Sequence, residues 1–81
     1  MKPAMNKPIK FDRHAKRRMK WRRISEDEVF SVIDGPDKTE ESVMGRVNCY
    51  KRVGQRYLKV TFREFPDEIR IISAVDKGVA Q

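Results

Sequence analysis

The first part of the chain has the hydrophobic pattern of a helix. Residues 13–22 contain no Gly, Pro or β-branched side chain, and Asp12 stands in the position of an N-cap. Phe11, Ala15 and Met19 recur at four-residue spacing and would form one narrow buried stripe. The pattern therefore predicts a first helix over these ten residues, with one face against a core.

A second helix begins at a capping box. Ser25 is followed three residues later by Glu28, so each side chain can accept a hydrogen bond from the other residue's backbone N–H. Gly35 and Pro36 end the segment, because glycine can adopt the left-handed geometry of a helix end and proline cannot continue a helix. The predicted buried face consists of Val29, Phe30, Val32 and Ile33.

From Thr39 the hydrophobic period changes to two, which is typical of strands. The clearest pair of strands is 47–53 and 56–63, joined by Gly54-Gln55, a two-residue loop with glycine where a type II′ turn requires it. This turn sets the register and sorts the side chains onto two faces. The mostly apolar face has the pairs Val47 with Phe62, Cys49 with Val60 and Lys51 with Leu58. The other face has the pairs Arg46 with Arg63, Asn48 with Thr61, Tyr50 with Lys59 and Arg52 with Tyr57.

The last predicted strand, 68–75, follows a four-residue connection from Glu64 to Asp67. The expected pairs are Phe62 with Ile69, Thr61 with Arg70 and Val60 with Ile71. The core side would hold Ile69, Ile71 and Val75, and the other side would hold Arg70, Ile72 and Ala74. A short extended piece at 9–11 and an edge strand at 39–44 have weaker patterns, so the predicted number of paired strands is three to four.

This order of elements predicts an α+β fold, with two N-terminal helices packed on one face of a three- to four-stranded antiparallel sheet. A single domain at 9–76 would follow a flexible leader at 1–8 and precede a tail at 77–81. The second face of the sheet stays open, and its cations and tyrosines suit an anionic chain with stackable bases. The residues expected to bind RNA there are Tyr50, Arg52, Tyr57, Lys59, Arg63 and Arg70.

Composition limits the available chemistry. The 81 residues include one Cys and one His, too few for a disulfide framework or a Cys/His zinc site, and we expect no metal and no small-molecule cofactor. Cys49 is expected in the core, because its partner across the hairpin points inward. No segment approaches the roughly 20 apolar residues of a membrane span. We therefore expect a cytoplasmic protein without a membrane partner.

The formal net charge of +7 is unevenly distributed along the chain. Residues 1–23 sum to +9, residues 24–45 to −6 and residues 46–81 to +4. An anionic partner would be drawn to the basic segments, although a solvated basic surface accounts for the same charge.

One set of residues has an obvious chemical use. His14, Arg18 and Arg22 fall at i, i+4 and i+8, so they form one line along the first helix. A histidine can transfer a proton near neutral pH, and guanidinium groups bind phosphate. These two roles nearly suffice to cleave RNA by attack of a 2′-OH on the neighbouring phosphate, without a metal. The alternative is a solvated helix face, with the open-face tyrosines serving only as cross-strand packing.

The same helix carries a family resemblance. The residues His14-Ala15 followed by Arg18-Met19 resemble a family of small bacterial domains with an H-A-x-x-R-M helix and no assigned function. The last strand, Arg70-Ile71-Ile72-Ser73-Ala74, is similar to the end of BrnT toxins, and both groups are placed near the RelE/ParE superfamily. Arg23 departs from the pattern, since related sequences commonly have glycine there, and a strained helix junction or a longer helix is expected.

The resemblance implies a compact RelE-like fold, metal-independent RNA cleavage in the active members, and an antitoxin that binds the toxin. Our first hypothesis is therefore a toxin of a type II toxin–antitoxin system, an endoribonuclease with His14, Arg18 and Arg22 as catalytic residues. The alternative is a noncatalytic module of the same fold that binds RNA, a ribosome surface or a protein. A third reading is a toxin-like domain that is kept as half of a complex with its cognate antitoxin.

Overall fold

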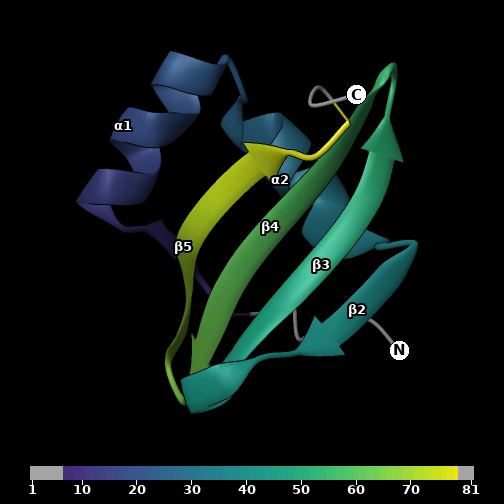
Figure 1. Cartoon of the computed structure of the whole chain (residues 1–81). Helices are drawn as coiled ribbons and strands as arrows, with labels where there is room; N and C mark the ends of the chain where they lie inside the picture. Colours follow the sequence, from purple (N-terminus) through teal and green to yellow (C-terminus); the bar gives the residue numbers. More distant parts are fainter. Residues whose placement is uncertain (1–6, 79–81) are drawn as a thin grey trace.

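The computed structural model describes residues 7–78, so most of the predicted leader and the end of the predicted tail lie outside the described residues. One five-stranded sheet has the strand order β1-β5-β4-β3-β2, and two helices precede its last four strands in the chain (Figure 1). The elements are β1 (Ile9–Phe11), α1 (Arg13–Arg22), α2 (Glu26–Asp34), β2 (Lys38–Glu41), the 3-10 turn η1 (Val43–Gly45), β3 (Arg46–Val53), β4 (Arg56–Phe65) and β5 (Glu68–Asp76).

The expected α+β class is confirmed, but the sheet is mixed and has five strands rather than three or four antiparallel ones. The difference is β1, which pairs with β5 in parallel, with Lys10 beside Arg70. The Pro8 carbonyl accepts a hydrogen bond from the Ile69 N–H at 2.9 Å and aligns the two strands. Parallel pairing between segments so distant in the sequence leaves no local turn signal, so β1 could be expected as extended chain but not placed.

Both helices leave one face of the sheet uncovered. In Figure 1, α1 flanks β5 at one edge of the sheet and α2 lies behind β3 and β4. Ala15 and Met19 are buried, as their spacing predicted, and the Phe11 ring lies 5.8 Å from that of Phe30. The core consists of Ala15, Met19, Ile24, Val29, Val32, Ile33, Cys49, Leu58, Val60, Phe62, Ile69, Ile71 and Ala74. Within the described residues, neither helix is long and apolar enough to cross a membrane.

The helix ends agree with some of the predicted capping features and differ from others. The capping box is confirmed, because the Glu28 N–H donates to Ser25 Oγ at 3.1 Å and the Ser25 N–H donates to Glu28 Oε1 at 2.8 Å. Asp12 occupies the N-cap position of α1 but its side chain makes no capping hydrogen bond. Gly35 ends α2 with φ of −151°, so the predicted left-handed geometry is wrong there. Arg23 instead adopts it, with φ of 57° and ψ of 42°, which confirms the strained junction.

The hairpin of β3 and β4 has the predicted register at every pair. Val53 lies opposite Arg56 across the turn, and Gly54 adopts the positive φ of 64° that a glycine-led turn requires. Cys49 therefore lies opposite Val60, and both side chains are buried. The turn chemistry alone places this hairpin correctly.

The register of β4 with β5 differs from the prediction in two ways. First, β4 continues to Phe65, because a residue before proline favours extended backbone, so only two residues connect the strands and Phe62 pairs with Ile71. Second, a bulge between Thr61 and Phe62 moves the register by one more residue, so Val60 pairs with Ala74. Alternation reverses beyond a bulge. Ala74 is therefore in the core, and Val75, predicted there, is not.

Candidate nucleic-acid interface

Three arginines stand side by side on the open face of the sheet. Arg63 in β4 is paired with Arg46 in β3 and with Arg70 in β5, and all three side chains are exposed. Lys10 in β1 pairs with Arg70 and extends the row to a fourth strand. Neighbouring strands lie about 4.8 Å apart, so this arginine row (Lys10, Arg70, Arg63 and Arg46) spans about 14 Å.

The arginine row keeps most of its positive charge. Glu68 forms an ion pair with Arg70 at 2.8 Å, whereas among residues 7–78 neither Arg46 nor Arg63 forms an ion pair. The guanidinium carbons of Arg63 and Arg70 lie 5.2 and 5.5 Å from the centre of the Phe65 ring. This ring holds the two cations over an apolar surface and accepts them on its negative face.

A polar row separates the arginines from the aromatic end of the face. Thr61 Oγ1 donates a 2.7 Å hydrogen bond to Asn48 Oδ1, and the register places Ser73 on the other side of Thr61. Thr61 is buried although it is polar, and this bond satisfies its hydroxyl. The row offers hydroxyl and amide groups at a fixed level of the sheet.

Two stacked tyrosines occupy the aromatic end of the face. The rings of Tyr50 and Tyr57 are 5.9 Å apart and inclined at 23°. Lys38 Nζ lies 5.1 Å from the centre of the Tyr50 ring, and the Arg52 guanidinium carbon lies 5.7 Å from that of Tyr57. Lys59 pairs with Tyr50 and adds another cation. Aromatic faces among cations are the chemistry that holds nucleobases beside phosphates.

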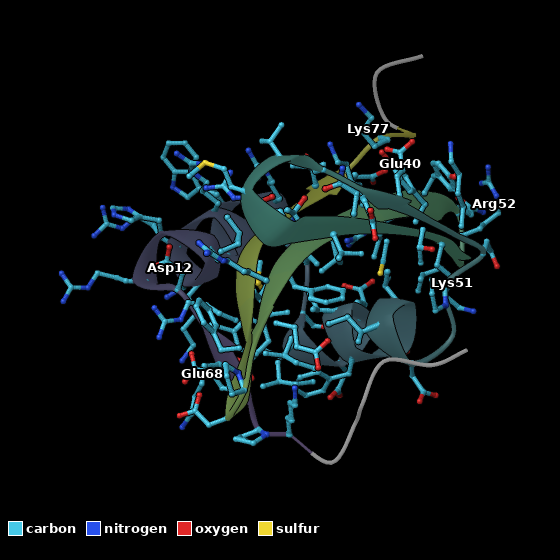
Figure 2. All side chains as sticks on the ribbon, turned by 90° about the horizontal axis from the view of Figure 1, so that it is seen from below. Asp12, Glu40, Lys51, Arg52, Glu68 and Lys77 are labelled. Carbon is cyan, nitrogen blue, oxygen red and sulfur yellow. The ribbon has the colours of Figure 1, made fainter. Side chains whose placement is uncertain are left out.

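A carboxylate modifies the aromatic end. Tyr50 Oη donates a 2.8 Å hydrogen bond to Glu40 Oε1. This bond lowers the pKa of the Glu40 carboxyl, with a further lowering from Lys38, and raises the pKa of the Tyr50 phenol. Figure 2 shows Glu40 on the side of the sheet away from α2, and Lys51 on the side of α2. The tyrosine is thus held in one orientation on the open side.

The line of His14, Arg18 and Arg22 runs beside the edge of β5. The Asp12 N–H donates to the Ile71 carbonyl at 3.2 Å, where α1 begins, and Arg22 Nη1 donates to the Ala74 carbonyl at 3.0 Å, where it ends. The side chains of His14 and Arg18 are exposed and, among the described residues, make no hydrogen bond or ion pair. The line therefore flanks the open face, with Arg22 anchored to β5 and two side chains free.

The structure brings together every residue predicted to bind RNA. Tyr50, Arg52, Tyr57, Lys59 and Arg63 lie on the open face where the hairpin register placed them. Arg70 lies there too, but beside Arg63 rather than beside Thr61, and so completes a row that the expected register would have broken. The prediction missed Lys10, Lys38, Arg46 and Phe65. Arg46 could have been found, since the predicted register already set it opposite Arg63.

Cys49 and the acidic residues offer no competing site. Burial raises the pKa of the Cys49 thiol to about 11, so this side chain is a poor nucleophile at neutral pH. Within the part of the chain that the structure describes, no three His, Cys, Asp or Glu side chains are grouped as they would be around a metal ion.

A comparison with protein families matches residues 11–76 to a domain of unknown function, DUF4258. The chain belongs to this family. The DUF4258 match extends from the end of β1 to the end of β5, so it includes the α1 line and nearly all of the open face, but not Lys10. No curated protein and no solved structure matches the chain. The function of this DUF4258 domain must therefore be argued from its own surfaces.

Proposed function

We propose that this DUF4258 domain binds single-stranded RNA on the open face of its sheet. The observation that carries the proposal is that the arginine row and a stacked tyrosine pair share the face that α1 and α2 leave uncovered. Phosphates would contact Arg46, Arg63 and Arg70, and bases would stack against the tyrosines.

Charge on this face favours a polyanion. Cations outnumber carboxylates on the open face. Its carboxylates Glu40 and Glu68 are each already bonded to a neighbour on the same face. Each phosphate contact releases condensed counterions, so a face of this kind gains affinity from every cation and loses it as salt is added.

A single strand fits the face better than a duplex. Stacking on Tyr50 and Tyr57 needs bases that are free of their partners, and the 2′-hydroxyl of RNA can exchange hydrogen bonds with Ser73 and Asn48 in the polar row. A duplex presents mainly its phosphate backbone, which would contact the arginine row but would not stack on the tyrosines.

A binding experiment tests this proposal. Fluorescence anisotropy with a labelled 12-nucleotide RNA should give a negative slope of log affinity against log salt, and Arg63→Gln should reduce that slope by about 0.7, the share of one phosphate on a single strand. Arg17→Gln removes the same charge from α1, away from the sheet, and serves as the matched control. Equal slopes for Arg63→Gln and the parent protein would remove the arginine row from the interface.

Cleavage of the bound RNA is a second proposed activity, supported by the free His14 imidazole at the edge of β5 and by the RelE/BrnT resemblance. His14 would remove the 2′-OH proton while the 2′-oxygen attacks the adjacent phosphorus and the bond to the 5′-oxygen breaks. The products are a 2′,3′-cyclic phosphate and a 5′-hydroxyl, whose proton comes from water. Arg18 would offset the charge that develops on the phosphate.

This activity needs a separate assay. Purified protein incubated with end-labelled RNA and a chelator should produce fragments that end in cyclic phosphate, and His14→Asn should abolish them while RNA affinity stays unchanged. Cleavage by the His14→Asn variant at the parent rate would exclude His14. Absence of cleavage with salt-sensitive binding would leave the noncatalytic RNA- or ribosome-binding module.

The biological setting that we propose is a toxin of a type II toxin–antitoxin system. It is supported by the H-A-x-x-R-M helix and the BrnT-like last strand, and it requires a cognate antitoxin as protein partner. Co-expression with the protein encoded by an adjacent reading frame should relieve growth inhibition by this chain. If expression of the chain alone leaves growth unchanged, the toxin setting is wrong, whatever the outcome of the binding assay.

A further inference from the structure

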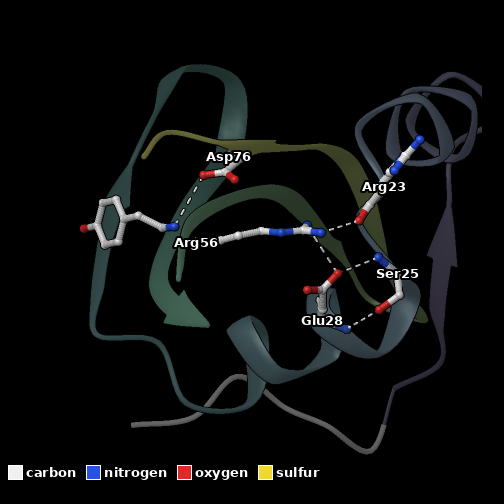
Figure 3. Close-up of polar contacts among 6 residues, drawn as sticks. Arg23, Ser25, Glu28, Arg56 and Asp76 are labelled. Carbon is white, nitrogen blue, oxygen red and sulfur yellow. Dashed lines mark hydrogen bonds and ion pairs between the residues drawn. The ribbon is translucent and has the colours of Figure 1, made fainter. Parts of the chain in front are cut away.

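A hollow of about 550 Å³ lies where the end of α1, the start of β4 and the end of β5 meet. Its lining consists of Arg22, Arg23, Arg56, Val75 and Asp76. Arg22 ends α1, Arg23 lies in the junction between α1 and α2, and Arg56 begins β4, so folding brings Arg56 to two cations that are far from it in the sequence. Figure 3 shows the Arg56 side chain reaching the Arg23 carbonyl and the Glu28 carboxylate.

Two of the guanidinium groups are held mainly by neutral acceptors. Arg22 Nη1 donates to the Ala74 carbonyl at 3.0 Å, and Arg56 Nη2 donates to the Arg23 carbonyl at 2.7 Å. A carbonyl fixes the orientation of a guanidinium but does not cancel its charge. Both groups are therefore oriented in advance and still attract an anion.

The carboxylates near the hollow already have other partners. Asp76 Oδ1 accepts the N–H groups of Gly78 at 3.0 Å and Tyr57 at 3.4 Å, so it holds the end of β5 in place. Glu28 accepts the Ser25 N–H at 2.8 Å and approaches Arg56 Nη1 at 3.5 Å. Three arginines thus line a hollow that has two engaged carboxylates beside it, and the site keeps a positive balance.

The backbone of Arg23 points to a role for its side chain. The αL geometry closes α1 through backbone groups alone, since the Arg23 N–H donates to the Lys20 carbonyl and the Ile24 N–H to the Met19 carbonyl. Glycine would make the same bonds with less strain. An arginine in this strained conformation, where glycine would fit better, indicates a role for its side chain. Arg23 is one of the residues that line the hollow.

We propose that this hollow binds a phosphate group. Arg22 ends the α1 line, and Val75 belongs to the same open-face row as Lys59, so the hollow continues the RNA path around the edge of β5. This inference deepens the proposed RNA binding and rests on it for one source of the phosphate, the RNA backbone. The other source is a free phosphate monoester, which offers the same chemistry.

The experiment follows the side-chain Nε–H signals of the arginines by NMR while inorganic phosphate, adenosine 5′-monophosphate or a 12-nucleotide RNA is added to the full chain. Phosphate should shift the signals of Arg22, Arg23 and Arg56, and Arg22→Gln should weaken phosphate binding about tenfold. Signals that do not move with any of the three probes would overturn the inference.

The variant Arg23→Gly separates the effect on phosphate binding from the effect on stability. It should raise the midpoint of thermal unfolding by about 4 °C, because strain is relieved, while phosphate affinity falls about tenfold. Among residues 7–78, Met44 is the other non-glycine residue with positive φ, at 60°, and it lies in η1. Met44→Gly should raise the midpoint similarly and leave phosphate affinity unchanged. Phosphate affinity of Arg23→Gly equal to that of the parent protein would contradict the assignment.

The outcomes distinguish this inference from the proposed function. If RNA binds with a salt-sensitive affinity but moves none of the three signals, the hollow is not part of the RNA path and the open-face proposal stands. If free phosphate moves them and RNA does not bind, the hollow is a site for small phosphate esters and the RNA proposal falls.

Discussion

The two faces of the sheet share the same strands and have opposite roles. On β4, Leu58 and Val60 point toward the helices and are fully buried, whereas Lys59 and Arg63 point the other way. Alternation along a strand makes this possible, because neighbouring side chains lie on opposite faces. The covered face contributes stability, and the open face contributes charge and aromatic surface.

This difference separates the effects of substitutions. Removing apolar atoms from the covered face leaves a cavity and lowers the free energy of unfolding, whereas changing an exposed open-face side chain leaves the packing intact. RNA affinity should show the reverse: open-face substitutions should lower it, and core substitutions that leave the protein folded should not. The comparison would fail if open-face substitutions unfolded the protein or if core substitutions changed binding without changing stability.

The largest expected effect is that of Leu58→Ala. Leu58 is fully buried, so the variant should lose about 3 kcal/mol of unfolding free energy through lost burial and a residual cavity. Urea denaturation followed by circular dichroism measures the loss. Lys59→Ala, at the next position and on the other face, is the control and should change stability by less than about 0.5 kcal/mol. Similar losses in both variants would contradict the assigned roles of the two faces.

The next effect comes from pH. Burial raises the pKa of the Cys49 thiol to about 11 from its ordinary 9.0, so the folded protein favours the neutral thiol. The resulting stability is fully present below pH 9 and is lost as the pH rises toward 11. Denaturation at a series of pH values measures it. Cys49→Ala lacks the thiol and should show a smaller decline over this window, and an equal decline would assign the loss to other groups.

Two hairpins show how far a sequence can predict this fold. The turn at Gly54 joins β3 to β4 with a two-residue glycine-led loop, and this local chemistry determines the whole register. Between β4 and β5 a four-residue connection from Glu64 to Asp67 was predicted, but Phe65, the residue before proline, stays extended and β4 continues to it. The bulge at Thr61 has no signal in the sequence, since it depends on packing against both neighbouring strands.

The cap of α2 gives a smaller and more local test. Ser25→Ala removes the acceptor for the Glu28 N–H and should cost about 1 kcal/mol, because α2 covers β3 and β4 and its end would fray. Ser42→Ala is the matched control, since Ser42 precedes η1 and its side chain makes no capping bond. Thermal unfolding compares the two variants. Equal losses of stability in the two variants would show that the capping box does not stabilise α2 on the sheet.

The candidate site was predictable to the extent that it lies on one hairpin. The tyrosines and Arg63 follow from the β3–β4 register, which needs only the turn. Lys10 requires the parallel pairing of β1 with β5, and the arginine hollow requires the end of α1 to meet the start of β4. Both depend on tertiary packing between distant segments, which a local pattern does not encode.

The smallest expected effect is that of Arg63→Gln on stability. Arg63 lies between Arg46 and Arg70, and like charges directly opposite on neighbouring strands destabilise a sheet, so its removal relieves repulsion. The same change removes the contact of the guanidinium with the Phe65 ring, which offsets part of the gain. The free energy of unfolding should therefore stay within about 0.5 kcal/mol of the parent value, and the difference should shrink further as salt screens the row. A loss above 1 kcal/mol would mean that the arginine row holds the sheet together and is not free to bind a ligand.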